Sequence, residues 1–369
     1  MSSRRAFLAA ALAAGGCGTE FANRKSDGMT RFAVSTRRLT LRHTWTIARG
    51  SSDFKDNVFV RIERNGIVGW GEAAPHVRYS ETPQQAVAAL ENAGPILESS
   101  DWFHYVDLRQ QCQPVFAGQT CVAAALDMAV LDWVCRSLNV PLWRLLGLDK
   151  AKAPLTTFSI GIDTPDVVRR KVAEAADYPV LKIKVGRDND AEILAAVRDA
   201  TDRPLRVDAN EAWTDRQVAL EKIRWLAGLG VELIEQPMPA DRIDDTAWLH
   251  EQTDMPIIAD EAVKTASDIP KLAGAYDGIN IKLAKSGGIQ EALRMIHLAR
   301  TLGLKVMLGC MIESSLGISA AAQISPLVDW ADLDGNLLID NDPFVGVGVA
   351  NGRLVLSDEP GLGARERRV

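Results

Sequence analysis

Acidic residues end three short apolar runs of this chain, and their type and placement could support metal-assisted proton transfer. The runs close on Asp208, Glu235 and Asp260. Three hard oxygen ligands with room for water suit Mg²⁺ better than Zn²⁺, so these carboxylates predict one bound Mg²⁺. A single carboxylate after a strand often caps the following helix instead. Three of them after successive runs favour a metal site.

Lysines follow two further runs, one before and one after the carboxylates. Lys182 and Lys184 end the first, and Lys285 comes just past the second. A carbon next to a carboxylate is very weakly acidic, so its deprotonation needs a cation that stabilises the enediolate and a base of depressed pKa. Crowding by Mg²⁺ and by a second lysine, together with desolvation, would supply such a base. One base on each face of the substrate would invert the carbon.

The chain from about residue 153 onward predicts the elements that bring these residues together. Short apolar strands alternate there with longer helices, such as 165–176 and 289–301. This pattern indicates a parallel sheet covered on both faces. We expect seven or eight strands, at 157–161, 181–185, 205–209, 232–236, 256–260, 278–283, 305–309 and 328–333. They fit a βα barrel, whose active sites lie at the C-terminal ends of the strands. The second and sixth strands of such a ring lie opposite, so Lys184 and Lys285 should approach a substrate from opposite faces.

The preceding segment predicts an α+β unit. Residues 58–63 alternate apolar and polar, and Asn65-Gly66 then turns into a second strand, as in a hairpin. Residues 82–97 and 120–138 read as helices. The fold class is therefore α/β, a modified eight-stranded TIM-like barrel with an N-terminal α+β capping domain. The expected boundaries are 1–28 for a signal peptide and linker, 29–150 for the capping domain, 151–335 for the catalytic barrel and 336–369 for a C-terminal return to the capping domain.

Composition excludes some classes of function. The 369 residues are 47% hydrophobic with a net charge of −6, which fits a soluble globular protein and argues against nucleic-acid binding. No run of about 18 apolar residues follows the N-terminal segment, so the mature chain is not expected to span a membrane.

The first residues resemble an export signal. Arg4-Arg5 precedes a short Ala/Leu stretch that ends at Gly15-Gly16-Cys17, in the order of a twin-arginine signal peptide. Cys17 resembles a lipoprotein acceptor, although Ala14 stands where such motifs usually carry Leu or Val. We therefore expect an exported protein, periplasmic or anchored through lipid at Cys17. A disordered basic start on a cytoplasmic protein is the alternative.

Five motifs together resemble the muconate lactonizing subgroup of the enolase superfamily over most of the chain after Arg31. They are Lys-x-Lys, Asp-Ala-Asn, Glu-Gln-Pro, Ala-Asp-Glu and Lys-Ser-Gly-Gly. The resemblance implies that Lys184 and Lys285 are the acid/base pair and that Lys182 helps to stabilise the enediolate. It also implies one Mg²⁺ per subunit at the three carboxylates. A homo-oligomer is expected as well.

A narrower resemblance, to dipeptide epimerases, comes from Ala331-Asp332-Leu333-Asp334-Gly335. In that family an Asp-x-Asp pair binds the free α-ammonium group of a dipeptide. Residues two apart on a strand face the same side, as this contact requires. A solvated turn before Gly335 is the alternative. The resemblance also implies substrate contacts for Ser159, Cys310, Met311 and Arg49.

One position departs from the family pattern. Members that act on Ala-Glu often carry Arg where this chain has Ser52, and that Arg holds the Glu side chain. Serine cannot pair with a carboxylate as arginine does. Arg49, Lys55 or Arg78 could take its place. The side chain of the second amino acid therefore stays open.

Other reactions compete with dipeptide epimerisation. o-Succinylbenzoate synthesis, N-acylamino acid racemisation and muconate cycloisomerisation use the same superfamily chemistry, but their substrates lack a free ammonium group for Asp332 and Asp334. An exported solute-binding lipoprotein is the alternative from another class. It leaves the three carboxylates and the opposed lysines without a purpose.

Overall fold

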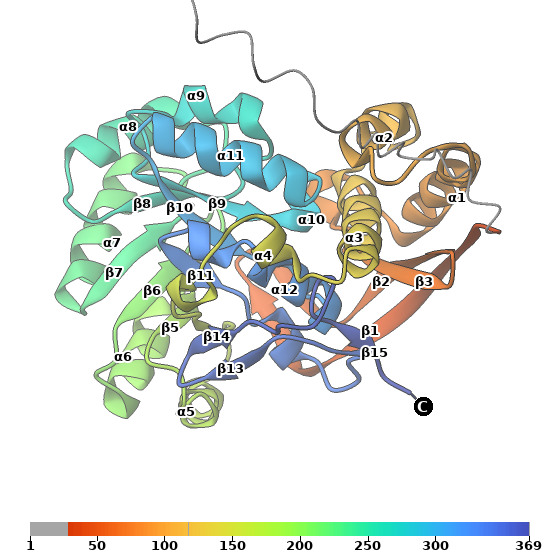
Figure 1. Ribbon diagram of the computed structural model, residues 1–369. Helices are drawn as coiled ribbons and strands as arrows, with labels where there is room; N and C mark the ends of the chain where they lie inside the picture. The colour runs from red at the N-terminus through yellow and green to blue at the C-terminus, as the bar shows by residue number, and fades with distance from the viewer. Residues whose placement is uncertain (1–28, 117, 369) are drawn as a thin grey trace, which may run out of the picture.

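The protein forms a barrel of parallel strands beside a smaller antiparallel sheet that carries its own helices (Figure 1). The computed structural model describes residues 29–116 and 118–368. The predicted signal segment and linker, including Cys17, lie outside the described residues. In the part of the chain that the structure describes, no helix is both long and apolar enough to cross a membrane.

Eight parallel strands form the barrel, and each pairs with the next along the chain. They are β4 (Phe158–Ile160), β5 (Leu181–Lys184), β6 (Leu205–Asp208), β7 (Val231–Glu235), β8 (Ile257–Ala259), β9 (Gly278–Lys282), β10 (Lys305–Gly309) and β11 (Trp330–Asp332). The ring nearly closes, because the N–H of Thr157 donates to the carbonyl oxygen of Ala331 at 3.3 Å. The predicted βα barrel is confirmed, and the predicted strands differ from the observed ones by only one or two residues at their ends.

Helices cover the outside of the barrel. They are α5 (Pro165–Glu174), α6 (Asp190–Ala200), α7 (Arg216–Gly228), α8 (Ile243–Glu251), α9 (Ile269–Leu272), α10 (Leu283–Ser286), α11 (Ile289–Thr301) and α12 (Ser315–Ala322). Because helices lie on one face and packed side chains on the other, the strands read as continuous apolar runs. Helix α10 follows β9 without a loop, which matters for the lysines of the site.

The N-terminal unit is a three-stranded antiparallel sheet with helices on one face. Its elements are β1 (Arg31–Ile47), β2 (Gly50–Arg64), β3 (Ile67–Ala73), α1 (Pro83–Ser99), α2 (Tyr105–Cys112) and α3 (Thr120–Ser137). Asn65 and Gly66 make the β2–β3 turn with φ values of 56° and 75°. Both fall in the left-handed region that a two-residue hairpin turn requires. Thr82 accepts a hydrogen bond from the N–H of Gln85 and so caps α1, which begins within one residue of the predicted helix.

Helix α3 joins the two units. Every residue from Cys121 to Cys135 is buried. On one side, a Cβ added at Gly71 of β3 would overlap the carbonyl oxygen of Ala125, so the sheet and the helix touch through backbone. On the other side, Asp127 accepts hydrogen bonds from the N–H groups of Ile289 and Gln290 at the start of α11, at 2.6 and 3.1 Å. The short helix α4 (Leu142–Leu145) then leads into the barrel.

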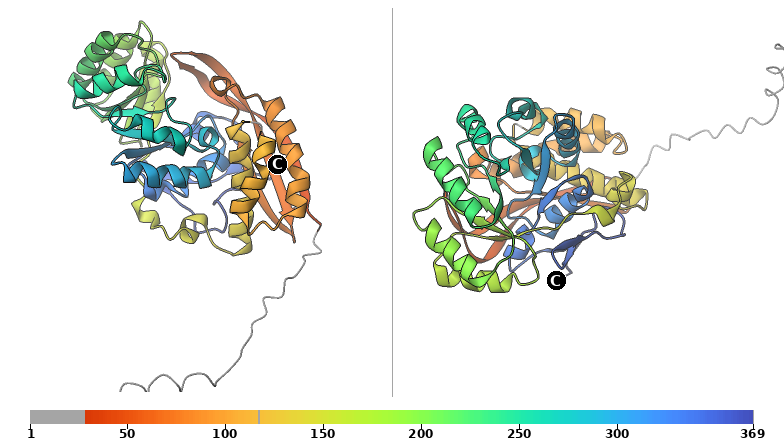
Figure 2. Two further views of the ribbon diagram at one scale, coloured as in Figure 1. Left: turned by 90° about the horizontal axis from the view of Figure 1, so that it is seen from above. Right: turned by 90° about the vertical axis from the view of Figure 1, so that its left-hand side faces the viewer.

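The tip of the β1–β2 hairpin reaches the barrel at the ends of its strands. The N–H of Ile162, just after β4, donates to the carbonyl oxygen of Thr46 at 2.9 Å. Arg187, after β5, donates to the carbonyl oxygen of Ile47 at 3.0 Å. Figure 2 shows the long β1–β2 strands extending from the helical layer toward the barrel helices. The hairpin therefore lies over the face where a βα barrel carries its active site.

The C-terminal segment divides between the two units. The pair β12 (Phe344–Val345) and β15 (Arg365–Glu366) lies near the N-terminal sheet, where the ring of Phe344 stacks on Phe59 at 5.7 Å. The second pair, β13 (Gly348–Ala350) and β14 (Arg353–Val355), lies against the barrel instead. Leu354 and Leu356 belong to the barrel core. We expected residues 354–356 to return to the N-terminal unit. They pack on the barrel because Arg353 bridges to Leu155, just before β4.

Candidate active site

Three buried carboxylates meet at the ends of three neighbouring strands. Asp208 ends β6, Glu235 ends β7, and Asp260 follows β8. One oxygen from each lies within 4.8 Å of the others, and none of the three side chains is more than 1% exposed. In the part of the chain that the structure describes, Glu235 Oε2 is buried and accepts no hydrogen bond, although the ammonium of Lys182 lies 2.7 Å from it. Converging oxygens with an unused lone pair fit a hard divalent cation such as Mg²⁺.

The electrostatics of these carboxylates also fit a cation site. Burial opposes ionisation of Asp208, but Lys184 and Lys182 outweigh it and lower its pKa. Burial likewise opposes ionisation of Asp260, and Lys282 and Lys285 hold its pKa well below the ordinary value. For Glu235, burial and then the charge of Asp208 raise the pKa to about 8. A bound divalent cation would favour the ionised form of all three.

Two lysines of β5 face the carboxylates. The ammonium of Lys182 lies 2.7 Å from Glu235, 3.3 Å from Asp208 and 2.5 Å from Asp332. Burial lowers the pKa of Lys182, but these carboxylates outweigh it and raise the pKa well above its ordinary value. Lys184 contacts Asp208 at 2.5 Å. Lys182 and Lys184 point to the same side because they lie two residues apart on one strand.

On the opposite side of the barrel, the lysine that faces the cavity is Lys282. It ends β9, its ammonium lies 2.7 Å from Asp260 Oδ2, and it lines the cavity. Lys285 lies one turn later, in α10, and does not line the cavity. Its ammonium donates to Asp260 Oδ1 and to the carbonyl oxygens of Asp260 and Asn280, at 2.6, 2.6 and 2.9 Å. These three acceptors turn the Lys285 side chain away from the cavity.

The sequence contains a pattern that could have identified Lys282 as a residue of the site. It ends an apolar run, Gly278–Lys282, just as Lys184 ends the run Leu181–Lys184. The expected strand ran one residue too far, to Leu283, and the predicted base, Lys285, was placed just beyond it. The backbone turns into α10 directly after Lys282, which carries Lys285 behind Asp260.

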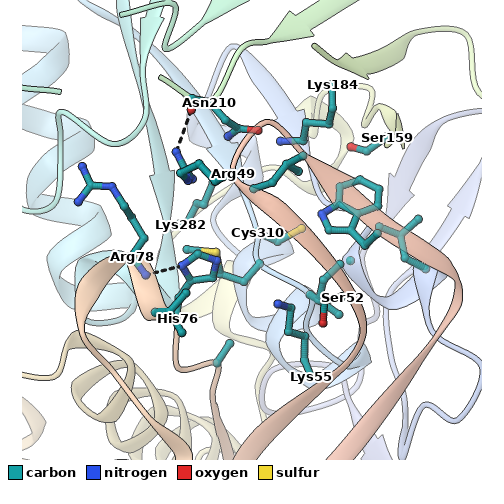
Figure 3. Close-up of a pocket in the computed structure, with 18 of the residues that line it drawn as sticks. Arg49, Ser52, Lys55, His76, Arg78, Ser159, Lys184, Asn210, Lys282 and Cys310 are labelled. Atoms are coloured by element: carbon teal, nitrogen blue, oxygen red, sulfur yellow. Dashed lines mark hydrogen bonds between the residues drawn. The ribbon is translucent and has the colours of Figure 1, made fainter. Parts of the chain in front are cut away.

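A cavity of about 430 Å³ lies between the barrel and the N-terminal hairpin. The residues predicted to contact a substrate all line it: Arg49, Ser159, Cys310, Met311, Asp332 and Asp334. Lys182 and Lys184 line it too, and so do residues that the sequence did not single out, among them Trp45, His76 and Asn210. Figure 3 shows Lys184 and Ser159 on one side of the cavity and Lys55 and Ser52 on the opposite side.

Asp332 and Asp334 form a buried acidic pair on one wall of the cavity. Asp332 accepts from the hydroxyls of Thr157 and Ser159 at 2.6 and 3.1 Å. Asp334 accepts from the N–H of Ser159 at 2.5 Å. Burial opposes ionisation of Asp332, but Lys182 outweighs it and lowers the pKa to about 2, whereas burial and the charge of Asp332 raise the pKa of Asp334 to about 7. Lys182 is the one cation that contacts this pair among the described residues. A second positive charge beside Asp334 would favour the ionised form of both carboxylates.

Several relatives of known sequence or structure are described as epimerases that act on dipeptides. The chain is 47% identical over 326 residues to the L-Ala-D/L-Glu epimerase of Bacteroides thetaiotaomicron, which covers 88% of this chain and 85% of that protein. It is 43% identical to the L-Ala-D/L-amino acid epimerase of Pedosphaera parvula, over 89% of this chain and 97% of that one. The dipeptide epimerase from Cytophaga hutchinsonii, solved with Mg and the dipeptide D-Ala-L-Val, matches with a TM-score of 0.87 at 26% identity, over 92% and 96% of the two chains.

These relatives correct the prediction of export. Their descriptions name epimerases and no exported protein or lipoprotein, which contradicts a twin-arginine route for this chain. The prediction of a periplasmic or membrane-anchored protein is therefore wrong. It depended on residues that the structure does not describe.

The family itself follows from two matches that together cover most of the chain. Residues 29–147 match the N-terminal domain of the mandelate racemase / muconate lactonizing enzymes. Residues 166–367 match the enolase C-terminal domain-like family. Both agree with the cap and barrel described above and with the resemblance seen in the sequence motifs. The chain belongs to the enolase superfamily, as a member of its mandelate racemase / muconate lactonizing enzyme group.

Proposed function

We propose that this protein is a Mg²⁺-dependent dipeptide epimerase, an isomerase that inverts the α-carbon of the C-terminal residue of a dipeptide by removing a proton from one face and adding a proton to the other. The observation that carries the proposal is the position of two lysines. Lys184 on β5 and Lys282 on β9 come from opposite sides of the barrel and face one cavity. One of these lysines, as the neutral amine, can remove a proton from one face of a carbon, while the other, as the ammonium, delivers its own proton to the opposite face.

The metal would be held by Asp208, Glu235 and Asp260. Bound there, Mg²⁺ supplies the positive charge that stabilises an enediolate. Lys182 adds to that charge, because its raised pKa keeps it protonated beside Glu235. Hydrogen bonds from Lys182 to the substrate carboxylate would strengthen as negative charge develops there.

Lys282 replaces Lys285 in our assignment of the second base. A base must come within hydrogen-bond reach of the proton it abstracts. Lys282 lines the cavity, whereas Lys285 is fully buried and bonded to three oxygens on the far side of Asp260. We assign Lys285 the structural role of holding Asp260 and the end of β9 in place.

The substrate assignment rests on the acidic pair. We assign Asp332 and Asp334 to the α-ammonium group of the dipeptide, with Ser159 orienting both carboxylates. Cys310 and Met311 line the same cavity. Substrates of o-succinylbenzoate synthases, N-acylamino acid racemases and cycloisomerases lack this ammonium group. They would bring no positive charge to the buried pair, in which Lys182 contacts Asp332, and burial of a carboxylate without an opposite charge is costly. The descriptions of the two relatives from Bacteroides thetaiotaomicron and Pedosphaera parvula favour neither these reactions nor a solute-binding protein.

Solvent exchange tests the proposal. A panel of L,L dipeptides is incubated with the protein and Mg²⁺ in D₂O, and proton NMR follows the α-protons. We expect deuterium at the α-carbon of the second residue only, together with the L,D diastereomer. Absence of exchange with every dipeptide, from folded and metal-loaded protein, would contradict the proposal. The predicted homo-oligomer stays a prediction, which light scattering after size-exclusion chromatography would check.

A further inference from the structure

Arg49 and Arg78 of the N-terminal unit reach the cavity but are already paired with barrel carboxylates. Arg49 contacts Glu211 at 2.9 Å and Glu261 at 2.7 Å. Arg78 donates to both carboxylate oxygens of Glu211, each at 2.9 Å. These two guanidinium groups fasten the N-terminal unit to the barrel loops. Each of these two charges therefore already faces a carboxylate of the barrel.

Lys55 also lines the cavity, and its ammonium is different. Within the described residues it has no carboxylate at ion-pair distance and no hydrogen-bond partner. The three barrel lysines of the cavity, Lys182, Lys184 and Lys282, each contact at least one carboxylate. Burial lowers the pKa of Lys55, and no neighbouring acid offsets this effect. A half-buried cation without a partner is costly unless something that enters the cavity supplies the opposite charge.

The position of Lys55 suits the side chain of a bound dipeptide. It lies on β2 beside Ser52, on the side of the cavity opposite Lys184 and Ser159 (Figure 3). Apolar side chains of the hairpin, Trp45 and Ile47, also line the cavity. A side chain with methylene groups and a terminal carboxylate would contact both kinds of surface. Ser52 cannot serve as the anion partner, since its hydroxyl already donates to the carbonyl oxygen of Phe54 at 2.5 Å.

We propose that Lys55 binds the side-chain carboxylate of the second residue, so that the preferred substrates are dipeptides with an acidic C-terminal residue. This inference rests on the proposed function, because it concerns the substrate of the same cavity. It makes Lys55 a specificity-determining residue. It has no part in the proton transfer itself.

Paired substrates and matched variants test this assignment. The kcat/KM of epimerisation is measured for L-Ala-L-Glu and for L-Ala-L-Gln, which has nearly the same shape without the charge. Wild-type protein should prefer Glu. In Lys55→Met the Glu/Gln ratio should fall about 10- to 100-fold, the range expected for a lost hydrogen bond to a charged group, mainly through KM. Lys55→Arg should keep the preference, and Lys55→Glu should shift it toward L-Ala-L-Lys.

Two controls separate this inference from folding defects and from the proposed function. Lys271→Met removes an exposed lysine of α9 and should leave both substrates unchanged. Turnover of L-Ala-L-Gln by the Lys55 variants reports whether the catalytic centre is intact. If wild type epimerises dipeptides without preferring Glu, or if Lys55→Met keeps the preference, the role of Lys55 is overturned while the proposed function stands. If wild type epimerises no dipeptide, the proposed function fails first.

Discussion

Lys282 and Lys285 bind different oxygens of one carboxylate, Asp260. Lys282 approaches Oδ2 at 2.7 Å from the cavity, and Lys285 approaches Oδ1 at 2.6 Å from the buried side. Three residues and the start of α10 thus separate a lysine that lines the cavity from one that does not. The two roles make different predictions for substitution.

Lys282→Ala should abolish epimerisation, whereas Lys285→Met should mainly destabilise the protein. Loss of a general base costs roughly 10²–10⁴-fold in rate. Lys285→Met leaves the carbonyl oxygens of Asp260 and Asn280 without their donor, at about 1–3 kcal/mol. Turnover and urea unfolding of both variants check this. A Lys285→Met protein that is stable but inactive, beside an active Lys282→Ala protein, would restore Lys285 as the base.

Lys184→Ala and Lys282→Ala should show mirror-image defects. Each lysine faces one side of the α-carbon, so each variant should lose solvent exchange with one diastereomer of a dipeptide. The other diastereomer should still exchange through the remaining lysine. Both variants should lose net epimerisation. Separate deuterium-exchange measurements on L,L and L,D dipeptides check this, and equal loss for both isomers in either variant would argue against a base on each face.

Removal of the metal, or of one of its proposed ligands, should stop the reaction and also remove a stability gain. A ligand that binds only the folded state at 100 times its Kd stabilises by about 2.7 kcal/mol. Mg²⁺ should therefore raise the melting temperature of wild type, but not of Asp208→Asn, Glu235→Gln or Asp260→Asn. Calorimetry with and without Mg²⁺ gives this readout independently of activity. Full turnover after exhaustive chelation, with metal content confirmed as nil, would exclude the metal requirement.

Gly71→Ala should destabilise the contact between the N-terminal sheet and α3. The added Cβ would overlap the carbonyl oxygen of Ala125, and overpacking of this kind typically costs about 1–3 kcal/mol. Gly228→Ala is the matched control, because nothing lies within 4 Å of the Cβ it would add at the end of α7. Urea unfolding should show a loss for Gly71→Ala only. Similar stability of the two variants would mean that β3 and α3 can separate at little cost.

The strand ends were predictable from sequence because two signals coincide there. Buried parallel strands are apolar, and a charged residue that ends one must lie near the open face of the barrel. This located Asp208, Glu235 and Lys184, and it also marked Lys282. The exact last residue of a strand is harder to place, since a helix can begin at once, as α10 does after Lys282. Because β9 ends at Lys282 and α10 begins at Leu283, Lys282 lines the cavity and Lys285 does not.

Contacts between the two units were beyond a sequence argument. Arg49, Lys55 and Arg78 are three cations of the N-terminal unit, and the sequence around them does not show which of them has an acidic partner. Only the fold brings Glu211 to both arginines, from more than one hundred residues away along the chain. Among residues 29–116 and 118–368, it leaves Lys55 without an acidic partner. The C-terminal segment shows the same limit, because its short strands are apolar enough to pack on either unit.

Asp332→Asn and Asp334→Asn should weaken binding of both diastereomers of a dipeptide together. The α-ammonium group lies away from the carbon that inverts, so its contacts are the same for each isomer. Loss of one charged hydrogen bond should raise KM about 10- to 100-fold and leave the L,L to L,D ratio of rates nearly constant. N-acetylated dipeptides, which lack the ammonium charge, provide the complementary control: wild type should bind them poorly, and the variants should lose much of that discrimination. Asp332 also contacts Lys182, so Asp334→Asn is the cleaner of the two variants. If both variants bind dipeptides as wild type does, the acidic pair does not recognise the ammonium group, and the dipeptide assignment falls while membership of the superfamily stands.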